Sequence, residues 1–258
     1  MRIKSKSLLY TGLMLFIPAL QVQAEQYDAT LRWSKRVELS VPVSGVIQEI
    51  YVEAGQKVAK DEKLLQLDDT IFKSRVSQAV SGLKSAEEQF KEAERELNRA
   101  NELYNRTVLA DHDLQLAKNA FVKAKADRDK ARYTLVKAKN DLKYSTLRAP
   151  FNAIVLERHA QVGMVISAEL KPETLLVLAD ADQMLARMSV SDAQLTQLKL
   201  GRVVKILINK EQLDGVIKAI GFEPVQGSSG TTSYPVDIEF NISGRTVRAG
   251  QRVKVDIP

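Results

Sequence analysis

Apolar residues between positions 70 and 144 recur every seven residues, in two successive runs. Such a repeat places one narrow apolar stripe along a helix, and two stripes joined by a short turn predict an antiparallel coiled coil. We expect the chain to fold back near Val108–Asp111, giving two helices of about 35 residues and a rod of roughly 50 Å. The predicted contact positions, called the seam below, are Val76, Leu83, Phe90, Leu97, Tyr104, Leu114, Phe121, Arg128, Leu135 and Leu142.

Alanine fills most of the d positions, the second contact position of each heptad, which favours a close approach of the two helices. The pairing places Leu97 opposite Phe121, and Arg128 opposite Phe90. Arg128 is the polar exception, and we expect its stem to lie along the ring while its guanidinium reaches water, so that it sets the register. Asp68 or Asp69 is predicted to cap the first helix and Asp111 the second. We expect such a rod to enclose no pocket.

A different pattern flanks this region, because a short segment rich in Val and Ile occurs twice, 108 residues apart. The segment from Val41 to Val58 can be laid over the segment from Ala149 to Ile166. Matched pairs under this shift are Pro42 with Pro150, Glu49 with Glu157, and Gly55 with Gly163. Neither half can bury its apolar face alone, so the halves are predicted to close on each other. The helical region then leaves and returns at one place.

The pattern changes again after Ala179. Alternating apolar and polar residues predict strands at Met184–Val190, Arg202–Ile208, Val216–Phe222, Tyr234–Asn241 and Val247–Ile257, with a short helix at Ser191–Leu200 capped by Ser191. These elements favour a small antiparallel β-barrel. Residues 227–230 are predicted to be a loop tip with no phosphate-binding context, because no helix follows them.

The predicted fold class is therefore α+β, elongated and multidomain. An antiparallel helical hairpin is inserted into a split β-sandwich, and a small antiparallel β-barrel follows. The expected boundaries are 1–24 for a signal peptide, 25–69 with 145–180 for the split domain, 70–144 for the hairpin, and 181–258 for the barrel.

The expectation for residues 1–24 comes from Arg2, Lys4 and Lys6 before an apolar run at 8–20, and from a small-residue cleavage site at Ala24. A retained membrane anchor is the alternative. No later stretch approaches the length of a membrane span. The chain has no cysteine, which excludes disulfides and Cys-ligated metals, and together with export suggests a periplasm.

The formal charge is +6, and the basic excess lies mainly on the second predicted helix. We interpret this excess as a solvated helix face, with an acidic partner or membrane surface as the alternative. The balance gives no reason to expect nucleic acid as a partner.

The sequence offers little support for catalysis. It has two histidines, His112 and His159, but no cysteine and no cluster of carboxylates at a spacing typical of an active site. His159 with Met164, Met184 and Met188 could in principle hold Cu(I), but Met at strand spacing is more often a core residue. We expect no enzyme activity, no cofactor and no metal.

Several short motifs together resemble the periplasmic adaptor subunits, or membrane fusion proteins, of the HlyD and RND-type efflux adaptor family. They are Val41–Ile47, Val52–Val58, Leu65–Asp68, Leu147–Phe151, Gly163 and Val247–Val253. The resemblance implies that the split domain is lipoyl-like. Lipoyl and biotin carriers share this half-domain pattern, but neither Asp68–Thr70 nor Leu147–Ala149 offers the Lys that such carriers modify.

The resemblance implies an adaptor that links an inner-membrane transporter of RND type or ABC type to a TolC-like outer-membrane channel. It also implies a homo-oligomer, trimeric or hexameric, located in the periplasm and associated with the inner membrane through its transporter. The alternative is a structural coiled-coil protein or an exported holdase. The chain stops at Pro258, whereas many adaptors continue into a membrane-proximal domain, so contact with a transporter is expected from the barrel and the lipoyl-like domain.

The same resemblance implies that the hairpin tip binds the outer-membrane channel. Arg99 and Leu103 match the first half of the tip motif of family members that dock TolC-like channels. Ala110 and Gln115 stand where those members have Ser and Asp. Arg99 and Leu103 are thus the candidate partner-binding residues, and the alternative is an ordinary solvent-facing pair.

Overall fold

The computed structural model describes residues 25–168, 173–226, 232–242 and 244–257. The predicted signal peptide at 1–24 and loop tip at 227–230 lie outside the described residues. The chain forms two compact units. One unit contains residues 32–185 and 241–249, and the other is built from the remaining stretches.

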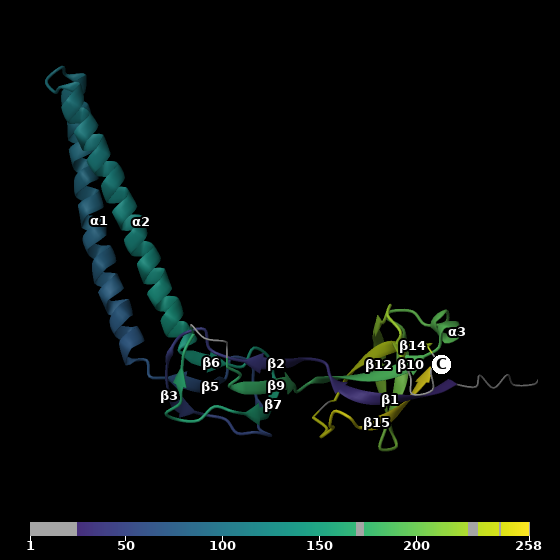
Figure 1. The fold of residues 1–258 in the computed structure, drawn as a ribbon. Coiled ribbons are helices and arrows are strands. Elements are labelled where there is room, and N and C mark those ends of the chain that lie inside the picture. The colour runs from purple at the N-terminus through teal and green to yellow at the C-terminus, as the bar shows by residue number, and fades with distance from the viewer. Residues whose placement is uncertain (1–24, 169–172, 227–231, 243, 258) are drawn as a thin grey trace, which may run out of the picture. The chain divides into compact units, whose positions relative to one another are not determined.

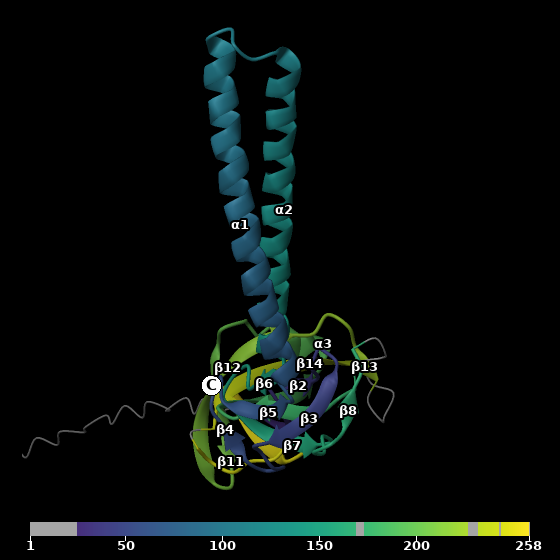
Figure 2. The ribbon, with the colours of Figure 1, turned by 90° about the vertical axis from the view of Figure 1, so that its left-hand side faces the viewer.

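Two long helices, α1 at Thr70–Asn105 and α2 at Asp111–Tyr144, run side by side in the first unit (Figures 1 and 2). Neither contains a proline that would interrupt the backbone hydrogen bonds. The most buried side chains of the pair are Phe72, Ala79, Ala86 and Ala100 on α1, and Leu114 and Ala138 on α2. Small side chains at these contacts allow the close approach that the sequence predicted.

Two four-stranded sheets form the β-sandwich of this unit. One sheet has the order β2-β9-β7-β4, with β2 at Arg36–Leu39, β9 at Leu176–Asp180, β7 at Ala153–Arg158 and β4 at Lys57–Val58. The other has the order β6-β5-β3-β8, with β6 at Thr146–Arg148, β5 at Lys63–Leu67, β3 at Gly45–Ile50 and β8 at Val165–Ile166. Each sheet therefore combines strands from before α1 with strands from after α2.

The two halves interlock with an approximate twofold relation that follows the repeat. Gly45 pairs with Ile166, and the residues 108 positions away, Ala153 and Val58, pair in turn. The backbone hydrogen bonds obey the same rule. The N–H of Gly55 donates to the carbonyl of Val155 at 2.7 Å. The N–H of Gly163 donates to the carbonyl of Ile47 at 2.8 Å. The closure predicted from the repeat is thus present residue by residue.

The base of the helical pair is anchored in the sandwich core. Phe72 in the first turn of α1 is only 2% exposed and belongs to the same apolar cluster as Leu65 and Leu67. After α2, the buried Ser145 donates from its hydroxyl to the carbonyl of Leu142 at 2.7 Å. Its own carbonyl accepts the N–H of Leu67 at 2.8 Å. The start of one helix and the end of the other are therefore held beside strand β5.

The second unit is a closed sheet with the strand order β10-β1-β15-β11-β12-β14, because β10 also pairs with β14. Its elements are β1 at Glu25–Trp33, β10 at Gln183–Val190, α3 at Asp192–Leu195, β11 at Val203–Ile208, β12 at Glu211–Ile220, β14 at Thr232–Asn241 and β15 at Arg252–Ile257, with β13 at Val225–Gln226 on the edge of β14. Arg187 on β10 donates two hydrogen bonds of 2.6 Å to the Asp237 carboxylate on the paired strand β14. The α+β class is confirmed.

Several sequence predictions need correction. Strand β1 was not predicted, although it pairs with β15 from Glu25↔Ile257 to Thr30↔Arg252. Strand β12 begins at Glu211 and not at 216, because Asn209 and Lys210 form a two-residue turn with positive φ at both positions. The last strand is shorter than Val247–Ile257. Asp111 does not cap α2, since Ala110 occupies that position and no side chain caps the helix.

Candidate interaction surfaces of the helical pair

The tip of the helical pair is a compact turn held by two backbone hydrogen bonds. The N–H of Thr107 donates to the carbonyl of Tyr104 at 2.8 Å, and the N–H of Val108 donates to the carbonyl of Leu103 at 3.0 Å. This is the Schellman arrangement that often ends a helix, with the left-handed residue usually a glycine. Here that residue is Thr107, with φ of 60°. The turn beyond α1 thus has a fixed geometry despite lacking glycine.

The two residues carried over from the tip motif lie near this turn but differ in environment. Arg99 is exposed and donates to Glu96 at 2.8 Å, an ordinary pair between adjacent helical turns. Leu103 is partly buried, and its backbone carbonyl accepts the hydrogen bond from the Val108 N–H in the turn. Neither contact indicates a specialised binding site.

The seam residues follow the heptad pattern, with one exception at the tip. Leu114 is buried, and the others are partly buried, except Tyr104, which is 38% exposed. Tyr104 hydrogen-bonds the Asp111 carboxylate, which raises the pKa of the tyrosine. Arg128 lies over the Phe90 ring, 4.1 Å from its centroid, as the pairing predicted. Its guanidinium also donates to Asp129, which holds the pKa of that carboxyl below its usual value.

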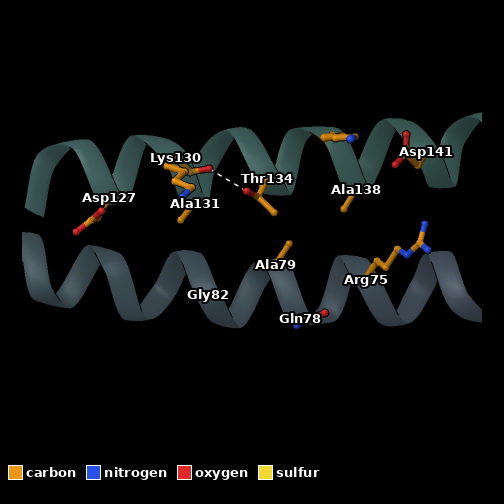
Figure 3. Close-up of a pocket in the computed structure, with 11 residues that line it drawn as sticks. Arg75, Gln78, Ala79, Gly82, Asp127, Lys130, Ala131, Thr134, Ala138 and Asp141 are labelled. Carbon is orange, nitrogen blue, oxygen red and sulfur yellow. Dashed lines mark hydrogen bonds between the residues drawn. The ribbon is translucent and has the colours of Figure 1, made fainter.

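An open groove of about 600 Å³ runs along one side of the helical pair (Figure 3). The expectation of a rod without a pocket is therefore wrong in this region. The groove is lined by Arg75, Gln78, Ala79 and Gly82 of α1 and by Asp127, Lys130, Ala131, Thr134, Lys137, Ala138 and Asp141 of α2.

The groove exists because small residues face each other where longer side chains would fill the space. Gly82 has no side chain, and a Cβ built at this position would meet no atom within 4 Å. Figure 3 shows Ala79, Ala131 and Ala138 pointing into the gap between the helices. Charged side chains also line the groove, and Figure 3 shows Arg75 extending from α1 toward the end of α2 that carries Asp141. This arrangement can receive a protruding apolar side chain, but it offers no group positioned for catalysis.

The residues considered as Cu(I) ligands lie in different environments. Met184 and Met188 are fully buried in strand β10, whereas the His159 side chain is about half exposed and lies 3.2 Å from Glu157. Among the residues that the structure describes, no three His, Cys, Asp or Glu side chains gather as metal ligands would. The two methionines are core residues.

Within the described ranges, no helix combines the length and the apolarity that a membrane crossing requires.

A split sandwich that holds a long helical pair, together with a six-stranded barrel, defines the class of barrel-sandwich hybrid proteins with a helical insertion. Residues 35–180 match the family model described as the CzcB-like, barrel-sandwich hybrid domain. The chain belongs to this family, which confirms the resemblance stated from the sequence motifs.

Curated relatives are similar at moderate identity. The macrolide export protein MacA of Yersinia pestis is 27% identical over 203 residues, covering 72% of this chain and 55% of the relative. The cobalt-zinc-cadmium resistance protein CzcB of Cupriavidus metallidurans is 23% identical over 205 residues, covering 76% and 38%. The multidrug export protein EmrA of Haemophilus influenzae is 25% identical over 272 residues, covering 86% and 67%. The chain spans about half the length of the MacA relatives it matches.

Solved structures share the fold. The membrane fusion protein Spr0693 from Streptococcus pneumoniae R6 superimposes with a TM-score of 0.67 at 16% identity, covering 90% of this chain and 97% of that one. A MacA-MexA chimeric protein that contains the Pseudomonas aeruginosa MexA α-hairpin domain gives 0.62 at 20% identity, covering 90% and 79%. At these identities the likeness establishes the fold alone.

Proposed function

We propose that this chain is the periplasmic adaptor of a tripartite efflux or export pump, linking an inner-membrane transporter to an outer-membrane channel and performing no catalysis. The observation that carries the proposal is the interlocked sandwich, which holds both ends of a long helical pair at one place. The family match supports it, and so do relatives named for macrolide export, cation efflux and multidrug export.

The proposed mechanism is mechanical. Because the helical pair is anchored in the sandwich through Phe72 and Ser145, the sandwich sets the position of the tip. The transporter supplies the energy. In this proposal the lipoyl-like domain consists of the expected segments 25–69 and 145–180 without strand β1, which belongs to the barrel sheet. Residues 70–144 form the coiled-coil hairpin, and 181–258 together with β1 form the barrel that contacts the transporter. The transporter is of RND or ABC type, and the adaptor works as a trimer or hexamer. Arg99 and Leu103 contact a TolC-like channel at the tip.

A test of this function is to replace the seam residues Leu97 and Leu135 with Asp. Each change places a carboxylate in the apolar contact between α1 and α2, and burying an unpaired charge costs several kcal/mol. We expect the rod to separate and export to be lost. Export is measured as intracellular accumulation of a panel of macrolides and divalent cations, and rod integrity by helical circular dichroism.

The matched control is Asn98→Asp with Asn140→Asp, which adds the same charges at exposed positions of the same helices. This control should leave both helicity and export intact. Full export by the Leu97→Asp, Leu135→Asp variant, with the rod demonstrably separated, would contradict a mechanical role for the helical pair.

A further inference from the structure

The barrel carries an open hollow of about 560 Å³ beside helix α3. It lies between α3, the turn that follows this helix, and the last part of strand β12 with the loop beyond it (Figure 1). Six of its lining residues are apolar or aromatic, namely Leu195, Leu200, Ala219, Ile220, Phe222 and Tyr234. A volume of this size suits a small organic molecule, since ligand pockets span roughly 300–1,000 Å³ and are mostly apolar.

Two of these apolar side chains are left open to solvent. Phe222 is 98% exposed and Leu200 is 65% exposed. An apolar side chain gains free energy from the surface that it removes from water, so Phe222 contributes almost nothing to the stability of its own chain. Contiguous apolar surface beside a hollow is typical of a binding site. The ring of Phe222 is therefore available to a ligand.

The backbone on both sides of the hollow has a fixed geometry. The N–H of Gly201, in the turn after α3, donates to the carbonyl of Ile217 at 2.9 Å. The N–H of Gly221, directly before Phe222, donates to the carbonyl of Pro235 at 2.8 Å. A Cβ built at Gly221 would lie 2.6 Å from Cγ of Pro235, so this close approach requires glycine. The hollow is preformed, which lowers the entropic cost of binding.

The lining contains a carboxylate that its own chain does not neutralise. Asp192 lines the hollow, and no cation among the described residues pairs with its side chain. Lys218 also lines it, but the ammonium of Lys218 donates to the Glu239 carboxylate at 3.0 Å, so this pair carries no net charge. Lys199 and Glu223 stand next to lining residues in the sequence, with opposite charges, and neither lines the hollow. The net charge of the site is therefore negative.

We propose that this hollow binds a small lipophilic cation. The apolar body of the ligand lies against Leu195 and Leu200, and its positive charge lies between the Asp192 carboxylate and the ring of Phe222. A carboxylate and an aromatic face both attract a cation, and aromatic rings commonly bind quaternary ammonium groups. A lipophilic anion of the same size is disfavoured, because no unpaired cation in the described part of the chain lines the hollow.

The test compares two ions of nearly the same size and shape, the cation tetraphenylphosphonium and the anion tetraphenylborate. Equilibrium dialysis against the purified full chain measures the affinity for each ion. The chain has a formal charge of +6, so non-specific attraction favours the anion. We expect saturable binding of tetraphenylphosphonium that is about tenfold or more tighter than binding of tetraphenylborate. Equal affinities, or tighter binding of the anion, would overturn the proposal.

Asp192→Asn removes the charge and keeps the shape of the side chain. The affinity for tetraphenylphosphonium should fall about tenfold, while the affinity for tetraphenylborate should not fall. Asp192→Glu restores the charge and should bind the cation within about threefold of the parent chain. The matched control is Asp28→Asn, which removes the same charge at an exposed position of β1 in the same barrel and should bind like the parent. If Asp192→Asn binds the cation as tightly as Asp28→Asn does, the proposed site is wrong.

Phe222→Ser tests the apolar part of the site independently of charge. Because Phe222 is almost fully exposed, the melting temperature of the chain should not change. The affinity for tetraphenylphosphonium should fall about fivefold or more, since the ring no longer contacts the ligand. Tyr133→Ser removes an exposed ring on α2 and should leave this affinity unchanged. A Phe222→Ser variant that binds the cation like Tyr133→Ser would show that the ligand does not occupy the hollow.

The inference goes beyond the proposed function, in which the adaptor is a mechanical link without a small-molecule ligand. Binding to the purified chain requires neither a transporter nor a channel, so the failures of the two proposals are distinguishable. If Asp192→Asn loses cation binding while the Leu97→Asp, Leu135→Asp variant still exports, the binding site stands and the adaptor function fails. If the parent chain does not bind the cation while the seam variant loses export, the binding site alone fails.

Discussion

At the scale of single residues, Asp180 shows how a buried charge can be satisfied by backbone geometry. The residue is 5% exposed at the end of β9, and its carboxylate accepts the N–H groups of Asp182 and Gln183 at 2.9 and 3.1 Å. Lys35 lies 3.2 Å away. Burial raises the pKa of this carboxyl, but the two backbone donors and Lys35 together outweigh it and hold the pKa below its ordinary value.

A carboxyl whose pKa is depressed in the folded state stabilises the fold above its unfolded pKa of about 3.9, and this contribution is lost as pH falls through the folded pKa. Asp180→Asn keeps an acceptor oxygen but loses the charge, so we expect it to cost roughly 1–3 kcal/mol at pH 7. The cost should shrink at pH 3. Urea unfolding at both pH values checks this, with the exposed Glu173→Gln as control. A cost that is equal at both pH values would assign the loss to packing.

At the scale of elements, the sequence predicted correctly the helices that a long heptad repeat encodes. It failed to predict a strand boundary that depends on the backbone dihedral angles of two turn residues. The heptad repeat predicted α1, α2 and the contact of Arg128 with Phe90, because the same apolar spacing recurs at many positions. The turn at Asn209 and Lys210 lacks the glycine that marks such hairpins, so the first half of β12 was missed. Strand β1 adjoins an apolar leader-like segment, and its pairing with β15 is a contact between chain ends that no local pattern reveals.

The tip turn permits a clean test of the proposed channel contact. Leu103 supports the turn through its backbone carbonyl, which a substitution retains, so Leu103→Ser removes the side chain while the hydrogen bond to the Val108 N–H persists. We expect crosslinking of a photoreactive residue at position 112 to the outer-membrane channel to be lost, with helicity unchanged. Val108→Ser, which alters a 71% exposed side chain in the same turn, is the control. Undiminished crosslinking in Leu103→Ser would show that the carried-over tip assignment is wrong.

At the scale of the whole chain, the repeat predicted a relation between distant segments, whereas the groove escaped prediction. A shift of 108 residues specifies which backbone groups of the two halves meet, since both halves share one local conformation. The groove forms because no side chain occupies the space beside Gly82. From the sequence alone, Gly82 is a residue that weakens a helix. The sequence pattern does not indicate whether a neighbouring side chain fills the space.

The interlocked halves also predict that equivalent positions carry equivalent energetic costs. Gly55 and Gly163 have φ of 88° and 85°, and a Cβ at either position would meet no atom within 4 Å. The cost of alanine at each is therefore a backbone cost, about 1–2 kcal/mol for an L-residue in the left-handed region. We expect Gly55→Ala and Gly163→Ala to lower the free energy of unfolding by similar amounts in denaturant titrations, while Gly82→Ala raises it. Costs that differ by more than about 1 kcal/mol would show that the approximate twofold relation of the backbone does not extend to its energetics.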